Sequence, residues 1–196
     1  MTNTTASGTW TVTVTAADLC NSTNTSFTLC VNKTQITGQV QLQGFVGTGT
    51  VPPHTRAVTF VASTNWVTAG PVTNTITLWT NTLTLTFVGD TANYTLTGLP
   101  PAANGLSAKT AWNKRSKVSV ALDVNSQATG VNLTGASELL GGDITGDNIV
   151  NLLDYNVLLE NYLTAAPVAD INGDGAVTLL DYNILLENWL TQGAPQ

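Results

Sequence analysis

Alternating hydrophobic and polar positions run through the first two-thirds of the chain. The run TWTVTVT at 9–15 places threonine and apolar side chains on opposite faces, and TSFTLCV at 25–31 can return as its hairpin partner. Residues 36–134 contain further short runs of this kind, separated by turn residues such as glycine, proline and asparagine. A two-residue period with β-branched side chains is typical of half-buried strands. The pattern predicts an N-terminal hairpin segment (1–34) and an antiparallel β-sandwich domain (35–137).

A hairpin of two strands is marginally stable alone in water, so we expect the segment 1–34 to pack on the sandwich or on a neighbouring molecule. The sandwich region, at about 100 residues, is long enough to enclose one hydrophobic core. The aromatic side chains expected in that core are Phe60, Trp66, Trp79 and Phe87. A sugar-binding platform built from the tryptophans is the rival interpretation, which would make the chain a carbohydrate-binding module.

Three segments of the sandwich region carry a resemblance to a known family. They are ITGQV at 36–40, AVTFVA at 57–62 and ANYTLTGLPP at 92–101. Together they resemble the carboxypeptidase regulatory-like family of transthyretin-type β-sandwiches. The resemblance implies a non-catalytic spacer or accessory module.

The hydrophobic period changes in the last third of the chain, where one segment occurs twice. DITGDNIVNLLDYNVLLENYLT at 143–164 returns, with few changes, as DINGDGAVTLLDYNILLENWLT at 170–191. In each copy a loop rich in aspartate, asparagine and glycine precedes a leucine-rich stretch with helical spacing. Glycine or proline stands before each loop, so no entering helix is expected. Each copy is therefore predicted to be a loop followed by one helix, or half of an EF-hand.

Each loop offers oxygen ligands at the spacing that a calcium ion requires. Carboxylates occupy positions 1, 5 and 12 of a twelve-residue window, and positions 3, 7 and 9 add side-chain or backbone oxygens. Position 6 needs a left-handed turn, which Gly175 provides in the second loop and Asn148 in the first. Since Thr145 is also a weaker ligand than asparagine, we expect weaker binding by the first loop. The expected ligands of two calcium ions are Asp143, Thr145, Asp147, Ile149, Asn151 and Asp154 in the first loop, and Asp170, Asn172, Asp174, Ala176, Thr178 and Asp181 in the second.

The repeated segment resembles type I dockerins over residues 143–190, and DINGDGAVTLLD is close to the family consensus. The resemblance implies a dockerin domain at 138–196 that folds around two calcium ions and binds a cohesin-like protein module. It also implies that loop positions 10 and 11 contact the partner. The helices lack the basic side chains, and the two loop pairs lack the hydroxyl groups, that many dockerins use in recognition, which indicates a more apolar interface. The expected partner-binding residues are Leu152, Leu153, Leu179 and Leu180.

The predicted fold class is therefore multidomain and mainly β, an antiparallel β-sandwich followed by a small all-α dockerin domain with two loop–helix calcium repeats. A domain of about 50 residues rarely sustains a hydrophobic core unaided. An ion that merely holds the fold together is thus the alternative to a docking function. We expect both roles, since the ion would stabilise the fold and the fold would present the surface.

Charge is scarce and unevenly placed along the 196 residues. Residues 1–137 hold six basic and three acidic side chains, a balance of +3, whereas residues 138–196 hold nine acidic side chains and no Lys or Arg, a balance of −9. The net charge of −6 argues against nucleic-acid binding, and no apolar run is long enough to span a membrane. The single histidine, His54, lies in a proline-rich turn, and half of the acids belong to the calcium loops, so no enzyme activity is expected.

Four of the six basic side chains lie close together in the sequence. The simplest interpretation of this cluster is a solvated hairpin. The alternative is an electrostatic contact with the acidic region 138–196. The residues of the cluster are Lys109, Lys114, Arg115 and Lys117.

Two cysteines, Cys20 and Cys30, predict a disulfide that closes the N-terminal hairpin, with two unpaired thiols as the alternative. A disulfide would indicate an extracellular protein, either secreted or on the cell surface. The first residues lack the basic start and apolar stretch of a signal peptide, so we expect a mature or truncated segment of a secreted protein. Several Asn-X-Ser/Thr sequences and the many threonines add glycans on Asn or Thr as an expectation.

Together these features predict a non-catalytic, calcium-binding module of a secreted protein that docks onto a cohesin-like partner. The alternative is a structural subunit that binds other copies of itself and assembles into an extracellular fibre or surface layer. Strand addition by the segment 1–34 and apolar contacts by the leucine pairs would drive that assembly.

Overall fold

The computed structural model describes residues 8–17, 22–31, 33–46, 54–67 and 73–195. Within these residues the chain is mainly β. The strands are β1 (Gly8–Ala17), β2 (Ser22–Val31), β3 (Gln35–Gln41), β4 (His54–Val67), β5 (Thr73–Phe87), β6 (Thr91–Thr97), β7 (Gly105–Lys109), β8 (Ser116–Ser119) and β9 (Gln127–Ala128). The helical elements are η1 (Gly135–Ser137), α1 (Leu152–Glu160) and α2 (Leu179–Glu187).

Seven of the strands form the two layers of a β-sandwich. One layer has the strand order β6-β3-β9, and the other has the order β5-β4-β7-β8. Neighbouring strands are antiparallel except β3 and β9, which run parallel. The predicted sandwich is therefore confirmed, with one parallel pair that the alternating pattern does not reveal.

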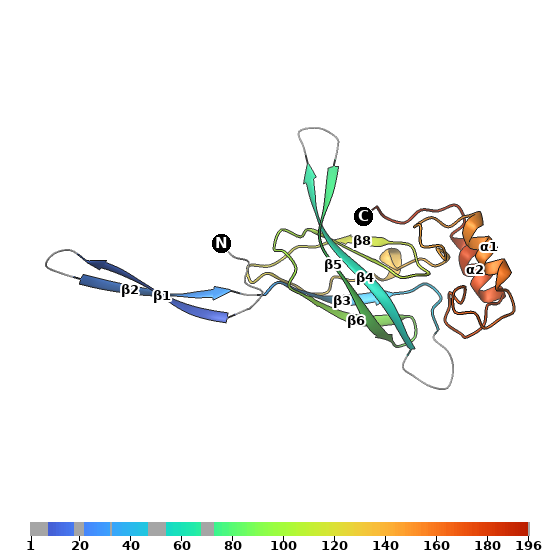
Figure 1. Ribbon diagram of the computed structural model, residues 1–196, viewed down its shortest axis with the longest axis horizontal. Helices are drawn as coiled ribbons and strands as arrows, with labels where there is room; N and C mark the ends of the chain where they lie inside the picture. Colours follow the sequence, from blue (N-terminus) through green and yellow to red (C-terminus); the bar gives the residue numbers. More distant parts are fainter. Residues whose placement is uncertain (1–7, 18–21, 32, 47–53, 68–72, 196) are drawn as a thin grey trace.

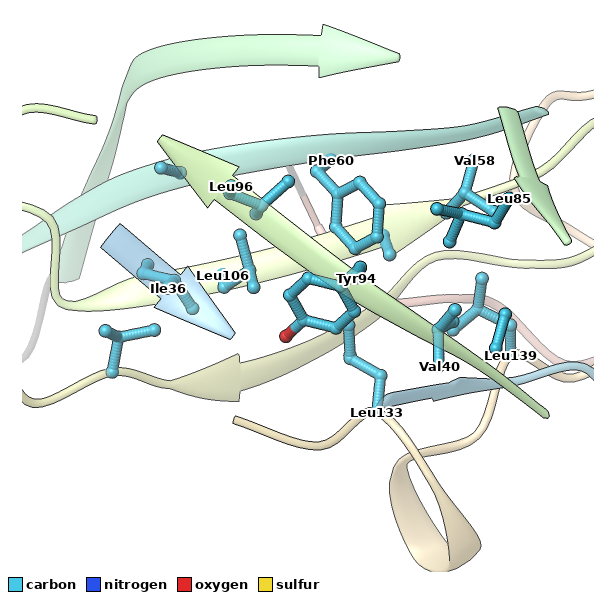
Figure 2. Close-up of a cluster of buried hydrophobic side chains, with 14 of the residues drawn as sticks. Ile36, Val40, Val58, Phe60, Leu85, Tyr94, Leu96, Leu106, Leu133 and Leu139 are labelled. Atoms are coloured by element: carbon cyan, nitrogen blue, oxygen red, sulfur yellow. The ribbon is translucent and has the colours of Figure 1, made fainter. Parts of the chain in front are cut away.

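The hydrophobic core lies between the two layers, as Figure 2 shows. In β6 the burial alternates, so that Ala92, Tyr94 and Leu96 face the core and the residues between them face solvent. The rings of Phe60 and Tyr94 meet across the layers, with centroids 4.7 Å apart. The Tyr94 hydroxyl donates a hydrogen bond to the Val131 carbonyl oxygen, so the buried phenol keeps a polar partner.

The aromatic residues expected in the core occupy it to different degrees. Phe60 and Phe87 are buried, as predicted, and Trp79 is partly buried against the core. The side chain of Trp66 lies outside the described part of the structure. The sandwich core is thus built by aliphatic residues and phenyl rings, with Trp79 at its margin.

Strands β4 and β5 form one long antiparallel hairpin. The alternation suggests two strands at 74–80 and 83–89, whereas the structure has a single strand, β5, of 15 residues. The intervening residues, Asn81 and Thr82, include neither glycine nor proline, so nothing there interrupts the extended backbone. The register with β4 shifts between Ala62 and Ser63, and Figure 1 shows the far end of the hairpin extending away from the two layers.

The N-terminal strands β1 and β2 pair antiparallel in a two-stranded sheet, from Gly8 opposite Val31 to Ala17 opposite Ser22. Figure 1 shows this hairpin at one end of the molecule, with α1 and α2 at the other. Its packing on a neighbour stays a prediction. Cys20 lies outside the described residues, so the predicted disulfide with Cys30 does too.

The prediction of a small all-α domain after the sandwich is wrong. The region 138–196 contains two helices of nine residues each, and most of its other described residues are loops and turns. Aspartate and asparagine side chains bond the loop backbone there, which competes with helix formation. The loops also bond the sandwich directly, as where the Lys114 backbone N–H donates to the Leu140 carbonyl oxygen at 2.8 Å. No helix among the described residues is long and apolar enough to cross a membrane.

Candidate functional site

The repeated segment folds into two loop–helix units of the same local structure. Each loop ends at a helix N-cap, where the side chain of Asn151 or Thr178 accepts a hydrogen bond from the helix backbone. The side chain of the aspartate three residues later accepts a hydrogen bond from the N-cap backbone N–H, which completes a capping box at each helix. These aspartates, Asp154 and Asp181, are the position-12 carboxylates of the two loops. Helix capping therefore fixes them at the loop's end.

The second loop brings its three carboxylates together. Oxygens of Asp170, Asp174 and Asp181 all lie within 4.8 Å of one another. Backbone N–H groups hold all three of these side chains in place, and Asp174 accepts from Ala176 at 3.0 Å. Asp170 accepts from Asp174 and Gly175 at 3.1 and 3.0 Å, and Asp181 accepts from Ile171 and Thr178 at 2.8 Å. The loop backbone thus orients the carboxylates toward one another.

Burial of this cluster raises its electrostatic cost. Asp170, Asn172 and Asp181 are all buried. Burial raises the pKa of the Asp170 carboxyl above its ordinary value, hydrogen bonds from Gly175 and Gly173 lower it, and the nearby charge of Asp181 raises it further. Clustered carboxylates repel one another, and a divalent cation would relieve that repulsion. The donor set of the second loop therefore fits a hard cation such as Ca²⁺.

The turn residues predicted at position 6 of the two loops are confirmed. Gly175 has φ of 87° and Asn148 has φ of 71°, both in the left-handed region. Position 4 is also left-handed in both loops, at Gly146 and Gly173. These turns fold each loop back on itself, which points its side chains toward a common centre.

The first loop arranges its carboxylates differently. The Lys109 ammonium at the end of β7 forms an ion pair with Asp143 Oδ2, at position 1 of the loop. At position 3 the Thr145 hydroxyl donates to Asp154 Oδ1 at 2.9 Å. Across the described residues, only the second loop has three carboxylates grouped closely enough to share an ion. The first loop therefore fits a second calcium ion poorly in this arrangement.

The two units are hydrogen-bonded to each other in a reciprocal way. The backbone N–H of Leu163, after α1, donates to the Val177 carbonyl oxygen of the second loop at 2.8 Å. The backbone N–H of Leu190, after α2, donates to the Val150 carbonyl oxygen of the first loop at 2.9 Å. Each loop is therefore fastened to the end of the other unit's helix, and the pair forms one approximately two-fold structure.

The predicted partner-binding residues all lie on the surface. Leu152, Leu153, Leu179 and Leu180 are 57–58% exposed, so the two copies present the same apolar pairs to solvent. Sequence reasoning missed four more exposed leucines at two equivalent repeat positions, although the repeat itself carried that signal. They are Leu159, Leu163, Leu186 and Leu190. The last turn of each unit places Leu163 or Leu190 at positive φ, an unusual backbone conformation for leucine.

A shallow pocket lies between the two helices on this apolar surface. Its volume is about 190 Å³, and its walls come from both units. The rings of Tyr155 and Tyr182, which are equivalent residues of the two copies, lie with centroids 6.1 Å apart, and Trp189 packs edge-on against Tyr155. The lining residues are Leu152, Tyr155, Tyr182, Leu186 and Trp189.

The sandwich contacts both loops through basic and aromatic side chains. Besides Lys109 on the first loop, Arg56 of β4 donates to the Asp170 carbonyl oxygen at 3.0 Å and stacks on the Trp112 ring at 3.9 Å. The Lys114 ammonium donates to Thr191, and the Arg115 backbone N–H donates to Asn148. The electrostatic interpretation of the basic cluster is therefore confirmed for Lys109. The simpler interpretation of a solvated hairpin is wrong at that residue.

Comparisons with known proteins add one likeness of fold. No family model and no curated protein matches the sequence. The structure is similar to a chain in the crystal structure of the Coh3ScaB–XDoc_M1ScaA complex, an N-terminal interface mutant of a type II cohesin–X-dockerin complex from Acetivibrio cellulolyticus. The two chains are 17% identical, the match covers 82% of this chain and 97% of that chain, and the TM-score is 0.51. The described chain therefore shares its fold with a component of a cohesin–dockerin complex.

Proposed function

We propose that this chain is a non-catalytic, calcium-dependent docking module of an extracellular protein. The second loop would hold the calcium ion, and the exposed leucines of the two units would bind a separate cohesin-like protein module. The observation that carries the proposal is the duplicated apolar surface, which rests directly on the loop that fits calcium.

The apolar surface favours a protein partner. Monomeric proteins rarely expose large apolar patches, and such patches mark interaction sites. Here eight exposed leucines come from two adjacent copies of one unit, and aromatic rings line the pocket between them. Two left-handed leucines, Leu163 and Leu190, maintain part of this exposure at a cost in backbone energy. Such a cost is expected where an exposed side chain serves binding.

Two lines of support favour a cohesin-like module as the class of partner. The sequence of the repeated segment resembles type I dockerins, which bind cohesin modules. The described fold is similar to a chain in the crystal structure of a type II cohesin–X-dockerin complex. A cohesin-like module is therefore the occupant that we assign to the leucine surface.

The ion would act on the surface through the capping box. Oxygens of Asp170, Asn172, Asp174 and Asp181 would hold the ion, with Ala176 and Thr178 completing the donor set, and the ion would supply positive charge to them. Asp181 also caps α2, whose first two residues are the exposed pair Leu179 and Leu180. Holding Asp181 therefore holds the first turn of that helix and the direction of both leucines.

The test measures binding of the full chain to immobilised cohesin modules of type I and type II by biolayer interferometry. We expect binding to at least one module in millimolar calcium, and loss of that binding in excess chelator. The double variant Leu152→Asp with Leu179→Asp should weaken binding more than about tenfold, since it places charge on the apolar surface of both copies. Val124→Asp is the matched control, because Val124 is fully exposed on the sandwich. Binding that ignores both calcium and the leucine variant, or no binding to any module, overturns the proposal.

Self-assembly is the second candidate function, and the β1–β2 hairpin favours it. These strands pair only with each other among the described residues, so each has one edge available for a further strand. Light scattering coupled to size-exclusion chromatography separates the two functions. Monomers at all concentrations favour docking onto a foreign partner, whereas concentration-dependent growth in calcium favours assembly of the chain with itself.

A further inference from the structure

The two loops receive different cationic partners from the sandwich. In the first loop the Lys109 ammonium contacts the carboxylate of Asp143, at position 1. In the second loop the Arg56 guanidinium contacts the backbone carbonyl oxygen of Asp170, the equivalent residue, at 3.0 Å. The hydrogen bonds to the Asp170 carboxylate come from backbone N–H groups of its own loop. In the first loop a side-chain cation therefore contacts the position-1 carboxylate. In the second loop the cation contacts the backbone instead, and the position-1 carboxylate stays open to an ion.

The ion pair in the first loop is buried. The Asp143 side chain has 0% of its surface exposed, and the Lys109 side chain has 15%. The ammonium also donates to the Asn113 carbonyl oxygen at 3.2 Å, which ties it to the sandwich. Burying a carboxylate without a counter-charge is costly, and here the lysine supplies that charge. The Asp143 carboxylate is thus neutralised from within the chain.

Other oxygens that could bind an ion in the first loop are also engaged in hydrogen bonds within the loop. Asp143 Oδ2, the oxygen that meets the ammonium, also accepts from the Asn148 backbone N–H at 3.1 Å. The Thr145 hydroxyl and backbone N–H both donate to Asp154 Oδ1 at 2.9 Å. A calcium ion in this loop would need Asp143 while the ammonium beside it repels the ion. Lysine and calcium therefore compete for one carboxylate.

We propose that the Lys109 ammonium is the resident cation of the first loop, so that the chain binds one calcium ion, in the second loop, and not two. The inference rests on the proposed calcium binding by the second loop. It replaces the expectation of two ions with an asymmetric pair, in which the sandwich permanently stabilises one unit and calcium stabilises the other. Removing the lysine converts the first loop into a second calcium site, because Asp143 Oδ1 is buried and has no hydrogen-bond partner within the described part of the chain.

Isothermal titration of the full chain with calcium tests this assignment by counting ions. The wild-type chain should bind one ion. Asp174→Asn, in the second loop, should abolish that event, whereas Asp147→Asn, at the equivalent position of the first loop, should leave one ion and its affinity within about threefold. These two variants are matched by the repeat, and neither touches Lys109, so they decide the question even if variants of the lysine fail to fold.

Lys109→Met supplies the converse test. It keeps the length of the side chain and removes its charge, and we expect a second binding event to appear in the titration. Thermal unfolding in excess chelator should show a lower midpoint for this variant than for the wild type, and calcium should restore more of the stability of the variant. Two ions in the wild type, with one lost in Asp147→Asn, overturn the assignment but leave the proposed function intact. No calcium binding by the wild type overturns the proposed function itself.

Discussion

Position 4 of the two loops offers a test of how the sandwich contacts the second unit. Gly146 and Gly173 are equivalent residues with φ of 82° and 72°. An alanine at either position pays about 1–2 kcal/mol for the left-handed backbone. The effect of alanine on the unfolded chain is similar at both sites, so it largely cancels when the two variants are compared. The difference in stability between the two variants then depends on the space available to the added methyl group.

That space differs sharply between the two sites. Around Gly146 a Cβ atom would meet nothing within 4 Å. At Gly173 it would overlap the Phe45 ring and come within 3.0 Å of Arg56 Nη2. The ring cannot move aside freely, because it is buried, packs edge-on against Phe87 at 5.2 Å and lies under the Arg56 guanidinium at 4.9 Å. Overpacking of this kind costs about 1–3 kcal/mol beyond the backbone term.

We therefore expect Gly173→Ala to lower the free energy of unfolding by about 1–3 kcal/mol more than Gly146→Ala does. Urea unfolding in excess chelator, followed by circular dichroism, measures the difference without interference from calcium. With a denaturant slope of about 2 kcal/mol/M, the midpoints of the two variants should differ by about 0.5–1.5 M. Equal losses, within about 0.5 kcal/mol, would refute the reasoning, because they would show that the Phe45–Arg56 pair does not pack on the second loop.

Three further predictions concern single side chains. Asn188→Ala should lower the free energy of unfolding by about 2–3 kcal/mol, because the buried amide donates to two backbone carbonyl oxygens and to Gln43. The equivalent variant Asn161→Ala loses one such hydrogen bond and should cost about 0.5–1.5 kcal/mol in the same urea assay. Leu185→Ala should cost about 2–5 kcal/mol in thermal or urea unfolding, since the side chain is fully buried beneath α2, and a cost near zero would contradict that placement. The pKa of the Glu138 carboxyl is raised above 4.5 by burial and by two nearby carboxylates, so the folded chain holds this proton more tightly than the unfolded chain. The free energy of unfolding should accordingly fall as pH rises through the range just above 4.5, and Glu138→Gln should flatten that decline in urea titrations at stepped pH.

The strands could be predicted from the sequence because their determinants are local. The alternation in TANYTLT corresponds residue by residue to the burial of β6. The pairing of β3 with β9 is different, since β9 is two residues long and its hydrogen bonds depend on a parallel neighbour far along the chain. The length of β5 could not be predicted from the sequence either, because the absence of a turn residue is weaker evidence for a continuous strand than the presence of one is for a break.

The loops show the same division between local and distant determinants. Ligand spacing, the N-caps and the left-handed position 6 are all encoded within twelve residues, and the structure has the caps and the turns. The contacts of Lys109 and Arg56 join residues 34 and 114 positions apart, so no local pattern could pair them. The separation of positive and negative charge along the chain raised such a contact only as the alternative to a solvated hairpin, and only for the cluster that includes Lys109. It could not indicate that one cation meets a carboxylate and the other a carbonyl oxygen.

The helices were over-predicted for a physical reason. Leucine-rich spacing describes α1 and α2 well, but each helix stops after nine residues at an asparagine and is followed by a left-handed leucine. The loop backbone is meanwhile bonded to aspartate side chains and to the opposite unit. Repetition of a helical pattern therefore predicts where helices lie without predicting that the region is all-α.

The reciprocal bonding of the two units has a consequence for how the chain could evolve. The two copies support each other, because the carbonyl oxygens of Val150 and Val177 each accept a hydrogen bond from the last turn of the other copy. Yet equivalent residues have already acquired different tasks, as Asn188 bonds the sandwich while Asn161 bonds only its own helix. Selection can then act on one copy as an anchor and on the other as a free surface. A duplicated segment can thus combine two different tasks while its two copies stay bonded to each other.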